Sequence, residues 1–145
     1  MALKELARYI SGYKVDLKGF TEDYYRQICS GELKPVLATI ELLKKLEIWL
    51  ELVYLVVPKQ NDNEDDVKNM CAWIKDKLGP DVPLHFSRFH PDYKLLDLPM
   101  TPKKTLDKLH KIAKSAGLNY VYVGNLPGHT AENTFCSGCN REIIR

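Results

Sequence analysis

The sequence predicts an α/β fold in which strand and helix units build a parallel sheet. Strand-like and helix-like segments alternate along the 145 residues, which is the pattern of βαβ units joined by right-handed crossovers. Residues 49–57 form an almost continuous apolar run, typical of a strand buried on both faces of a parallel sheet. The longer helical segments each carry one apolar stripe, which allows a helix to pack on such a sheet.

The first half of the chain is expected to hold two strands and two helices. Residues 13–18 (Tyr-Lys-Val-Asp-Leu-Lys) have the pattern of a short strand closed by a glycine. Thr21 opens a short helix that ends at Gly31, and Pro35 begins a second helix. Residues 49–57 follow as the second strand. The apolar stripe of the second helix consists of Val36, Ile40, Leu43 and Leu46.

The second half continues the alternation. Residues 58–63 are a polar loop, and one of its last three residues is expected to cap the next helix. Residues 84–89 form the third strand. Thr101 is expected to be an N-cap followed by proline at the first helical position, and residues 120–123 are the last parallel strand. The apolar stripes of these two helices consist of Val67, Met70, Cys71, Ile74 and Leu78, and of Leu106, Leu109, Ile112 and Ala116.

The pattern changes after Gly124. A loop leads to a Cys-x-x-Cys at Cys136 and Cys139, and then to a short terminal strand at residues 142–144. We therefore divide the chain into a strand-and-helix unit, residues 1–124, and a small tail, residues 125–145.

Composition and charge argue against several classes of protein. Hydrophobic residues make up 45% and charged residues 28%, an ordinary balance for a soluble domain. The net charge is only +2 and the lysines are spread out, so nucleic-acid binding is not expected. No apolar run approaches the roughly 20 residues that a membrane span needs. The N-terminus has no signal-peptide layout and the four cysteines are irregularly spaced, so we expect a cytoplasmic protein without a disulfide framework.

Asp16 and Lys18 are the first candidates for a functional site. Side chains alternate along a strand, so these two share one face while Val15 and Leu17 share the other. The apolar pair should meet the helices, which turns Asp16 and Lys18 towards the inner side of the sheet near its carboxyl edge. An acid and an amine buried there are costly unless they pair or bind a ligand. Both a structural ion pair and a ligand site fit this pattern.

Polar side chains also gather after the third strand, at His90, Asp92 and Lys94. The carboxyl ends of strands are where an α/β barrel builds its ligand site. A histidine beside such a loop is either a surface or packing residue or a ligand-binding group. His90 is the strongest single candidate in the chain.

Three interpretations of Cys136 and Cys139 remain open. As half of a zinc or iron site the pair needs two further ligands, because structural sites are usually four-coordinate. His129 is one candidate, whereas Cys29 and Cys71 are expected to lie in helices as packing residues. A redox Cys-x-x-Cys would normally open a helix after a strand, and this one precedes a strand. The third interpretation is a vacant pair of thiols.

Several segments resemble a known family. Asp-Leu-Lys at residues 16–18 is followed by Gly-Phe and a helix, and residues 57–62 (Val-Pro-Lys-Gln-Asn-Asp) follow the second strand. The most specific segments are residues 85–98 and residues 120–139, which contain Tyr-Val-Tyr-Val-Gly-Asn-Leu-Pro-Gly and Glu-Asn-Thr-Phe-Cys. In these segments the chain resembles radical S-adenosylmethionine (SAM) enzymes related to pyruvate formate-lyase activating enzyme, in the branch called the AmmeMemoRadiSam system.

The resemblance implies a partial barrel, the C-terminal half of a (β/α)6 barrel, with its last three strand-helix units and the tail in this chain. By position, Asp16 and Lys18 would contact the amino-acid or ribose portion of SAM, and His90 would contact the adenosine end. Val57 would be a weaker neighbour of SAM, since Lys59 stands where the family has glycine. The parent activity would be reductive cleavage of SAM at a [4Fe-4S] cluster, which yields methionine and a 5′-deoxyadenosyl radical.

The chain also departs from the family. It lacks the Cys-x-x-x-Cys-x-x-Cys motif whose thiolates hold the cluster, and the glycine-rich segment that holds the amino group of SAM. We therefore expect the chain to be inactive alone and to associate with a missing N-terminal half or a second copy of itself. A zinc or iron site at Cys136 and Cys139 would be completed in the same way. The alternatives are a free-standing nucleotide- or metal-binding module without catalysis and a purely structural interaction domain.

Overall fold

The computed structural model describes residues 2–145, and its strands and helices alternate as expected. Among these residues, no helix is both long enough and apolar enough to cross a membrane. In chain order the elements are α1 (Ala2–Leu6), β1 (Gly12–Asp16), α2 (Glu22–Gln27), α3 (Leu33–Lys45), β2 (Trp49–Val56), α4 (Glu64–Lys77), β3 (Leu84–Arg88), α5 (Lys103–Ser115), β4 (Val121–Gly124), the 3-10 turn η1 (Thr130–Glu132), β5 (Thr134–Phe135) and β6 (Glu142–Ile144).

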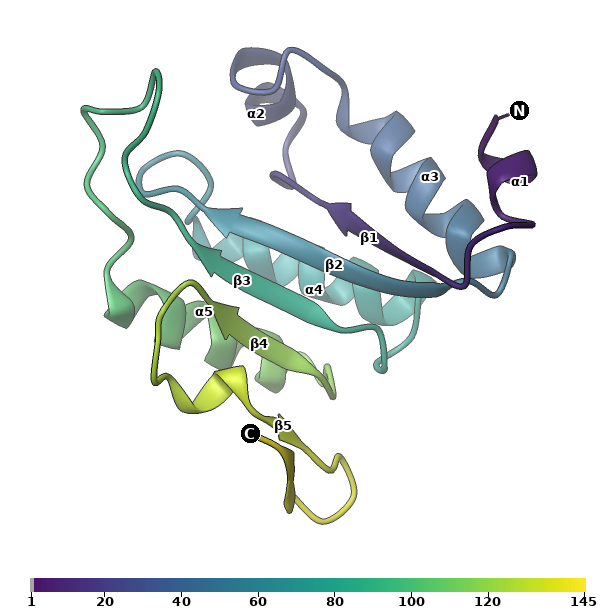
Figure 1. The fold of residues 1–145 in the computed structure, drawn as a ribbon. Coiled ribbons are helices and arrows are strands. Elements are labelled where there is room, and N and C mark those ends of the chain that lie inside the picture. The colour runs from purple at the N-terminus through teal and green to yellow at the C-terminus, as the bar shows by residue number, and fades with distance from the viewer. Residues whose placement is uncertain (1) are drawn as a thin grey trace.

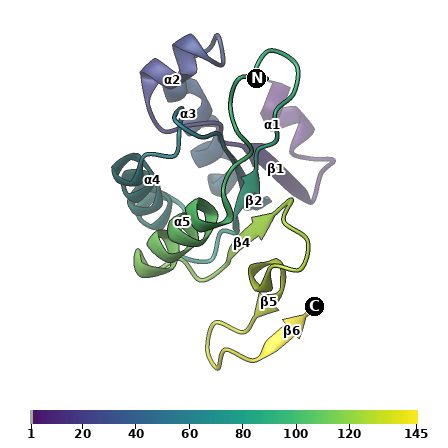
Figure 2. The same ribbon diagram turned by 90° about the vertical axis from the view of Figure 1, so that its left-hand side faces the viewer.

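Four strands form one parallel sheet in the order β1-β2-β3-β4 (Figure 1). The predicted α/β class and the parallel sheet are therefore confirmed. Helices α4 and α5 lie behind the sheet in Figure 1, and the turned view in Figure 2 shows α3 on the same side. Because all four strands run the same way, their carboxyl ends share one edge, which we call the carboxyl edge.

The two faces of the sheet are packed differently. Along β2, buried side chains alternate with more exposed ones, so that Leu52 and Tyr54 are fully buried while Trp49 is 61% exposed. The expectation that residues 49–57 are buried on both faces is thus wrong. Helices α3, α4 and α5 cover only one face, and the other, which we call the open face, keeps Trp49, Val53 and Leu55 in partial contact with solvent.

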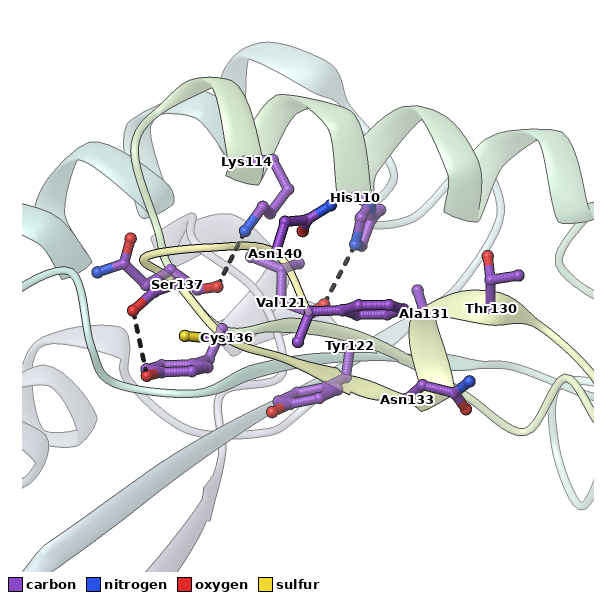
Figure 3. Close-up of a pocket in the computed structure, with 13 residues that line it drawn as sticks. His110, Lys114, Val121, Tyr122, Thr130, Ala131, Asn133, Cys136, Ser137 and Asn140 are labelled. Atoms are coloured by element: carbon purple, nitrogen blue, oxygen red, sulfur yellow. Dashed lines mark hydrogen bonds between the residues drawn. The ribbon is translucent and has the colours of Figure 1, made fainter. Parts of the chain in front are cut away.

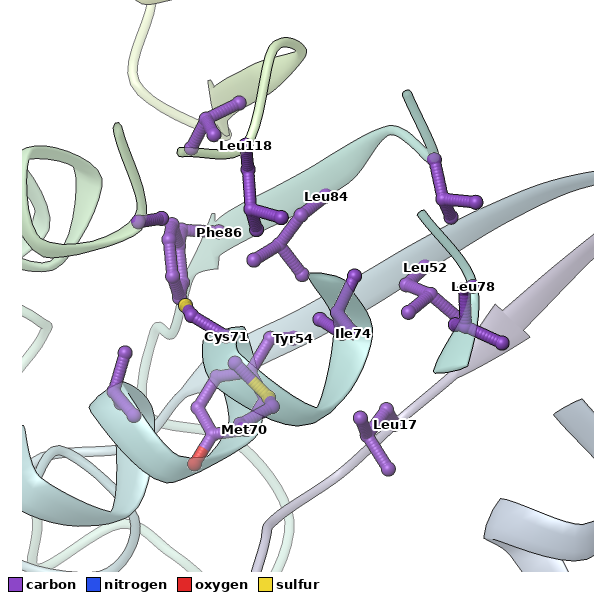
Figure 4. Packing of buried hydrophobic residues seen from close by; sticks show 14 of the residues in the cluster. Leu17, Leu52, Tyr54, Met70, Cys71, Ile74, Leu78, Leu84, Phe86 and Leu118 are labelled. Carbon is purple, nitrogen blue, oxygen red and sulfur yellow. The ribbon is translucent and has the colours of Figure 1, made fainter. Parts of the chain in front are cut away.

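The core lies between β2, β3 and the helices (Figure 4). Tyr54 of β2 and Phe86 of β3 meet edge to face with ring centroids 6.0 Å apart, a favourable aromatic geometry. The predicted stripe of α4 is buried at every position, which confirms that interpretation. Its members are Val67, Met70, Cys71, Ile74 and Leu78.

Two of the three expected helix caps are present. The Oγ1 atom of Thr21 accepts a hydrogen bond from the Tyr24 N–H at 3.2 Å and caps α2. Asn63 caps α4 by accepting from two backbone N–H groups. The third prediction is wrong, because Pro102 is the N-cap residue of α5 and Thr101 is fully buried. The Thr101 hydroxyl is hydrogen-bonded to the backbone of Val56 and Phe89 instead, because it lies between the ends of β2 and β3.

The tail contains the predicted strand β6, which pairs antiparallel with β5, a strand too short to be recognised in the sequence. Two residues attach the start of the tail to the rest of the chain. His129 Nε2 lies 2.8 Å from Asp107 Oδ1 of α5, and Ala131 is buried against the core. Two hydroxyl contacts join the hairpin to β4 and the residue before it, one of them between Tyr122 and Thr134 at 3.2 Å. The division of the chain at residue 124 stays a prediction.

Candidate functional site

The carboxyl edge carries the residues that the sequence singled out as a SAM-type site. Asp16 ends β1, Val57 follows β2, His90 follows β3 by two residues, and Asn125 follows β4. The parallel order of the strands therefore brings polar side chains from three segments, and the backbone of Val57 from a fourth, to one edge. The loop of residues 89–102, which joins β3 to α5, rises beyond this edge in Figure 1.

Asp16 and Lys18 form an ion pair with 3.0 Å between the Lys18 Nζ and Asp16 Oδ2 atoms. Their side chains are 48% and 42% exposed, so the pair is not buried as the sequence argument assumed. An exposed pair of this kind contributes no more than about 1 kcal/mol to stability. Both charges are therefore accessible to a ligand at the carboxyl edge.

The backbone of Lys18 is fixed on both sides by hydrogen bonds that the sequence did not reveal. Its N–H donates to the Tyr25 hydroxyl at 3.2 Å, and its carbonyl accepts from Asn61 Nδ2 at 2.7 Å. Asn61 is only 4% exposed, and its amide also donates to the Leu55 carbonyl and accepts from the Val57 N–H. This one side chain joins the end of β1 to the loop after β2. The sequence signalled Asn61 only as a possible helix cap.

The loop after β2 keeps a backbone conformation that glycine would favour. Lys59 has φ of 64°, and its N–H donates to Asp62 Oδ1 at 2.8 Å. A non-glycine residue in this left-handed region costs about 1 kcal/mol. Val57 is 3% exposed, so its side chain packs inward and only its backbone borders the edge.

Thr101 connects the ends of two strands. Its Oγ1 donates to the Val56 carbonyl at 2.6 Å and accepts from the Phe89 N–H at 3.0 Å. The Thr101 carbonyl accepts from Arg88 Nε at 2.9 Å. These bonds hold both ends of the loop that contains His90. A threonine before a proline signals a helix cap locally, and the pairing with β2, 45 residues earlier, has no signal in the sequence.

His90 is exposed on that loop. Its Nδ1 lies 2.7 Å from the Pro91 carbonyl oxygen, which can only accept, so Nδ1–H donates. The neutral ring then presents Nε2 as a hydrogen-bond acceptor. At the neighbouring strand end, Asn125 has φ of 58° and donates from Nδ2 to Ser87 Oγ at 2.9 Å.

The open face holds a second polar cluster, which the sequence analysis missed. Glu51 accepts hydrogen bonds from His85 Nε2 at 3.1 Å and from Trp49 Nε1 at 3.0 Å. The His85 ring stacks on Tyr122 with centroids 4.8 Å apart. Burial lowers the pKa of His85, although the carboxylate of Glu51 opposes that shift. The cluster borders a hollow of about 540 Å³ between the sheet and the tail.

Cys136 and Cys139 lie at the turn between β5 and β6. The backbone N–H groups of Cys139 and Gly138 are hydrogen-bonded to the Cys136 sulfur and lower the pKa of its thiol. Cys136 also lines a hollow of about 290 Å³ between the hairpin, β4 and α5, where His110 Nε2 donates to the Val121 carbonyl (Figure 3). Residues 2–145 contain no group of three His, Cys, Asp or Glu side chains that could hold a metal ion.

His129 is not a further ligand for these cysteines. Its Nε2 is bonded to Asp107, and its Nδ1 accepts the Ala131 N–H at 3.1 Å, so both ring nitrogens are in use. The side chain is 8% exposed. His129 is a candidate ligand in the sequence, but the fold uses it to attach the tail to α5.

Comparison with known proteins shows the fold. No family model matches the sequence. The uncharacterized protein MJ0808 of Methanocaldococcus jannaschii is 48% identical over 135 residues, which are 93% of this chain and 40% of that protein. The chain thus spans about 40% of the length of this curated relative.

Two solved structures share the architecture. A domain of pyruvate-formate lyase-activating enzyme from Bacteroides vulgatus superposes with a TM-score of 0.74 at 14% identity, covering 84% of this chain and 72% of that one. The fold resembles part of a radical SAM structure. A radical SAM methyltransferase from Sphaerobacter thermophilus gives a TM-score of 0.65 at 12% identity, covering 84% of this chain and 36% of that one. At these identities the likeness concerns the fold alone.

Proposed function

We propose that this chain is the C-terminal part of a radical SAM protein and that its carboxyl edge binds SAM. The observation that carries the proposal is the grouping of Asp16, Lys18 and His90 at one edge of a sheet whose fold resembles part of radical SAM structures. Catalysis in a longer protein, and its substrate, would depend on segments outside these 145 residues.

The chemistry of the edge matches that of SAM. The amino-acid end of SAM carries an ammonium and a carboxylate, and an aspartate beside a lysine presents the complementary charges. Asp16 would accept from the ammonium or from a ribose hydroxyl, and Lys18 would pair with the carboxylate. Hydrogen bonds to charged groups contribute about 1.5–3 kcal/mol each. His90 would accept a hydrogen bond at Nε2 from the adenine amino group.

A [4Fe-4S] cluster does not fit this chain. The cluster needs three closely spaced thiolates, and the described cysteines are separated by the fold. Cys71 is fully buried in the core, and burial raises the pKa of its thiol to about 12. Cys29 packs near α2, far along the chain from Cys136 and Cys139. We therefore derive no radical chemistry for the chain itself, and any reductive cleavage of SAM belongs to the longer protein.

The open face supports association with a further layer of protein. Trp49 is 61% exposed, and the Glu51–His85 pair beside it is only partly buried. Polar and apolar groups of this kind line the inside of a closed barrel. The remainder of a longer protein, or a second copy of this chain, would cover them.

Calorimetric titration with SAM tests the proposal. The parent chain should bind SAM weakly, and Lys18→Ala and His90→Ala should each weaken binding about tenfold, which corresponds to about 1.4 kcal/mol. Lys45→Ala is the matched control, because Lys45 ends α3 at the opposite edge of the sheet and should leave the affinity unchanged. If the parent chain gives no heat of binding, or if the variants titrate like the parent, the proposed SAM site is contradicted.

A second candidate is a nucleotide-binding module without catalysis, which the absence of cluster thiolates favours. Titration with adenosine separates the two functions. Equal affinity for adenosine and SAM would favour the nucleotide module, because the aminoacyl end would then contribute nothing at Asp16 and Lys18.

A further inference from the structure

The hairpin β5–β6 presents its two cysteines as a pair of neighbouring sulfur donors. Two backbone hydrogen bonds close the turn: the Asn140 N–H donates to the Cys136 carbonyl, and the Cys136 N–H donates to the Arg141 carbonyl, both at 2.8 Å. Asn140 has φ of 56°, which bends the chain back towards β5. The Cys136 sulfur lies over the turn, because a Cβ added at Gly138 would meet it at 4.0 Å. The turn thus places both cysteines of the Cys-x-x-Cys within one closed loop of the hairpin.

The rest of the described chain offers no ligands to complete such a site. His129 uses both ring nitrogens elsewhere, and Cys71 is enclosed by the core. Cys29 follows α2, which lies beyond β1 at the other side of the sheet from the hairpin (Figure 1). Structural zinc sites are almost always tetrahedral with four protein ligands. The hairpin therefore supplies half of a site.

The surface beside the cysteines fits a second copy of the same hairpin. Ile143 on β6 is 63% exposed, although isoleucine is among the residues most often buried, whereas Ile144 on the opposite face lines the hollow between the tail and the sheet. Strand β6 pairs only with β5 in the described chain, so its outer edge is unpaired. An unpaired strand edge with exposed apolar side chains is a template for association with another chain. A second copy would also bring a second Cys-x-x-Cys to the same place.

We propose that two copies of this chain join through their hairpins around one zinc ion, which is bound by Cys136 and Cys139 of each copy. The four thiols would lose their protons to solvent as the zinc–sulfur bonds form, giving a tetrathiolate with a net charge of −2. Arg141 beside the turn would offset part of that charge, as would Arg145, which follows β6 and pairs with Glu142 at 3.2 Å. The inference does not depend on SAM binding, since it concerns a different part of the molecule.

Zinc titration of the reduced full chain tests this proposal. The measurements are bound zinc by elemental analysis and molar mass by light scattering after gel filtration. We expect one zinc per two chains and a rise in mass from 16.7 kDa to twice that value. Cobalt in place of zinc should give the intense ligand-field absorption of a tetrahedral thiolate site.

Variants separate the metal site from other effects. Cys136→Ser with Cys139→Ser should abolish both zinc binding and the rise in mass, and circular dichroism should show that the sheet and helices persist. Cys29→Ser is the matched control and should behave like the parent. One zinc per chain at unchanged mass, a chain that stays free of zinc, or a dimer that persists in the double variant would each overturn the proposal.

Discussion

The carboxyl edge of the sheet and the C-terminal hairpin are attached to the same core in different ways. At the edge, the buried side chains of Asn61 and Thr101 join strand ends to one another through hydrogen bonds of 2.6–3.0 Å. Two hydroxyl contacts at more exposed positions attach the hairpin to the sheet, one of 3.2 Å to Tyr122 of β4 and one of 3.5 Å to Tyr120 just before it. The edge is therefore held together by buried hydrogen bonds, whereas the hairpin is closed by its own backbone hydrogen bonds and is joined to the sheet by weaker contacts.

Among the variants that test this comparison, Asn61→Ala should lower the free energy of unfolding the most. Asn61→Ala leaves the Lys18 and Leu55 carbonyls and the Val57 N–H without their partner, so unfolding free energy should fall by about 3 kcal/mol or more. Urea denaturation measures this change, and SAM affinity should fall with it. Asn63→Ala is the matched control: it removes only the cap of α4, should cost about 1 kcal/mol, and should leave SAM affinity unchanged. Equal losses in the two variants would contradict the role of Asn61.

A pair of tyrosine substitutions compares the two regions directly. The Tyr54 hydroxyl donates to the Asn61 carbonyl at 2.8 Å inside the core, while the Tyr122 hydroxyl meets Thr134 at 3.2 Å on the tail. Tyr54→Phe should destabilise the chain by about 1–2 kcal/mol, and Tyr122→Phe by less than about 0.5 kcal/mol. Thermal unfolding checks both values. A larger effect at Tyr122 would mean that the hairpin is as firmly attached as the edge.

Glycine at position 59 should stabilise the chain. Lys59→Gly relieves the cost of a left-handed lysine, and we expect a gain of up to about 1 kcal/mol, reduced by the greater freedom of glycine in the unfolded chain. Lys34→Gly, within the first turn of α3, should instead be destabilising. Urea denaturation of both variants tests the assignment, and a loss of stability at position 59 would contradict it.

Lowering the pH should reduce the free energy of unfolding through His85. This should be the smallest of the predicted effects on stability. Burial lowers the pKa of His85 in the folded state, so the unfolded chain binds protons more readily as pH falls through the usual range of histidine. The free energy of unfolding should therefore decrease below about pH 6.5, the unperturbed histidine value. His110 has a pKa lowered by burial as well and contributes with the same sign. His85→Gln should flatten the pH dependence, and a steeper dependence in that variant would contradict the assignment.

The sequence predicts the parts of this fold that depend on local pattern. The apolar stripe of α4, the cap at Thr21 and the order of strands and helices follow from periodicity and short-range chemistry. Thr101 was assigned wrongly because its partner Val56 is 45 residues away, and only the folded sheet brings them together. The burial of β2 on both faces was wrong for a related reason, since an apolar run does not reveal that one face lacks a covering layer.

The placement of the candidate residues along one edge is predictable to a similar extent, and their role in binding stays a prediction. Asp16, Lys18 and His90 stand at predicted strand ends in the sequence, and the parallel sheet aligns those ends. Asn61 was missed because an asparagine in a polar loop usually indicates a turn or a cap, and its buried amide is visible only once β1 lies beside β2. The sequence does not show that both ring nitrogens of His129 are bound to Asp107 and Ala131, because these contacts form only in the folded chain.

Nuclear magnetic resonance of the uniformly ¹⁵N-labelled chain during a SAM titration tests the central claim most directly. If the carboxyl edge is a preformed SAM site, the largest changes in amide chemical shift will occur at Lys18, Lys59, His90 and Asn125. The chemical shifts of hairpin residues 136–144 will stay unchanged. Shifts confined to the hairpin or to the open face around His85, or a spectrum unchanged by SAM, would contradict it.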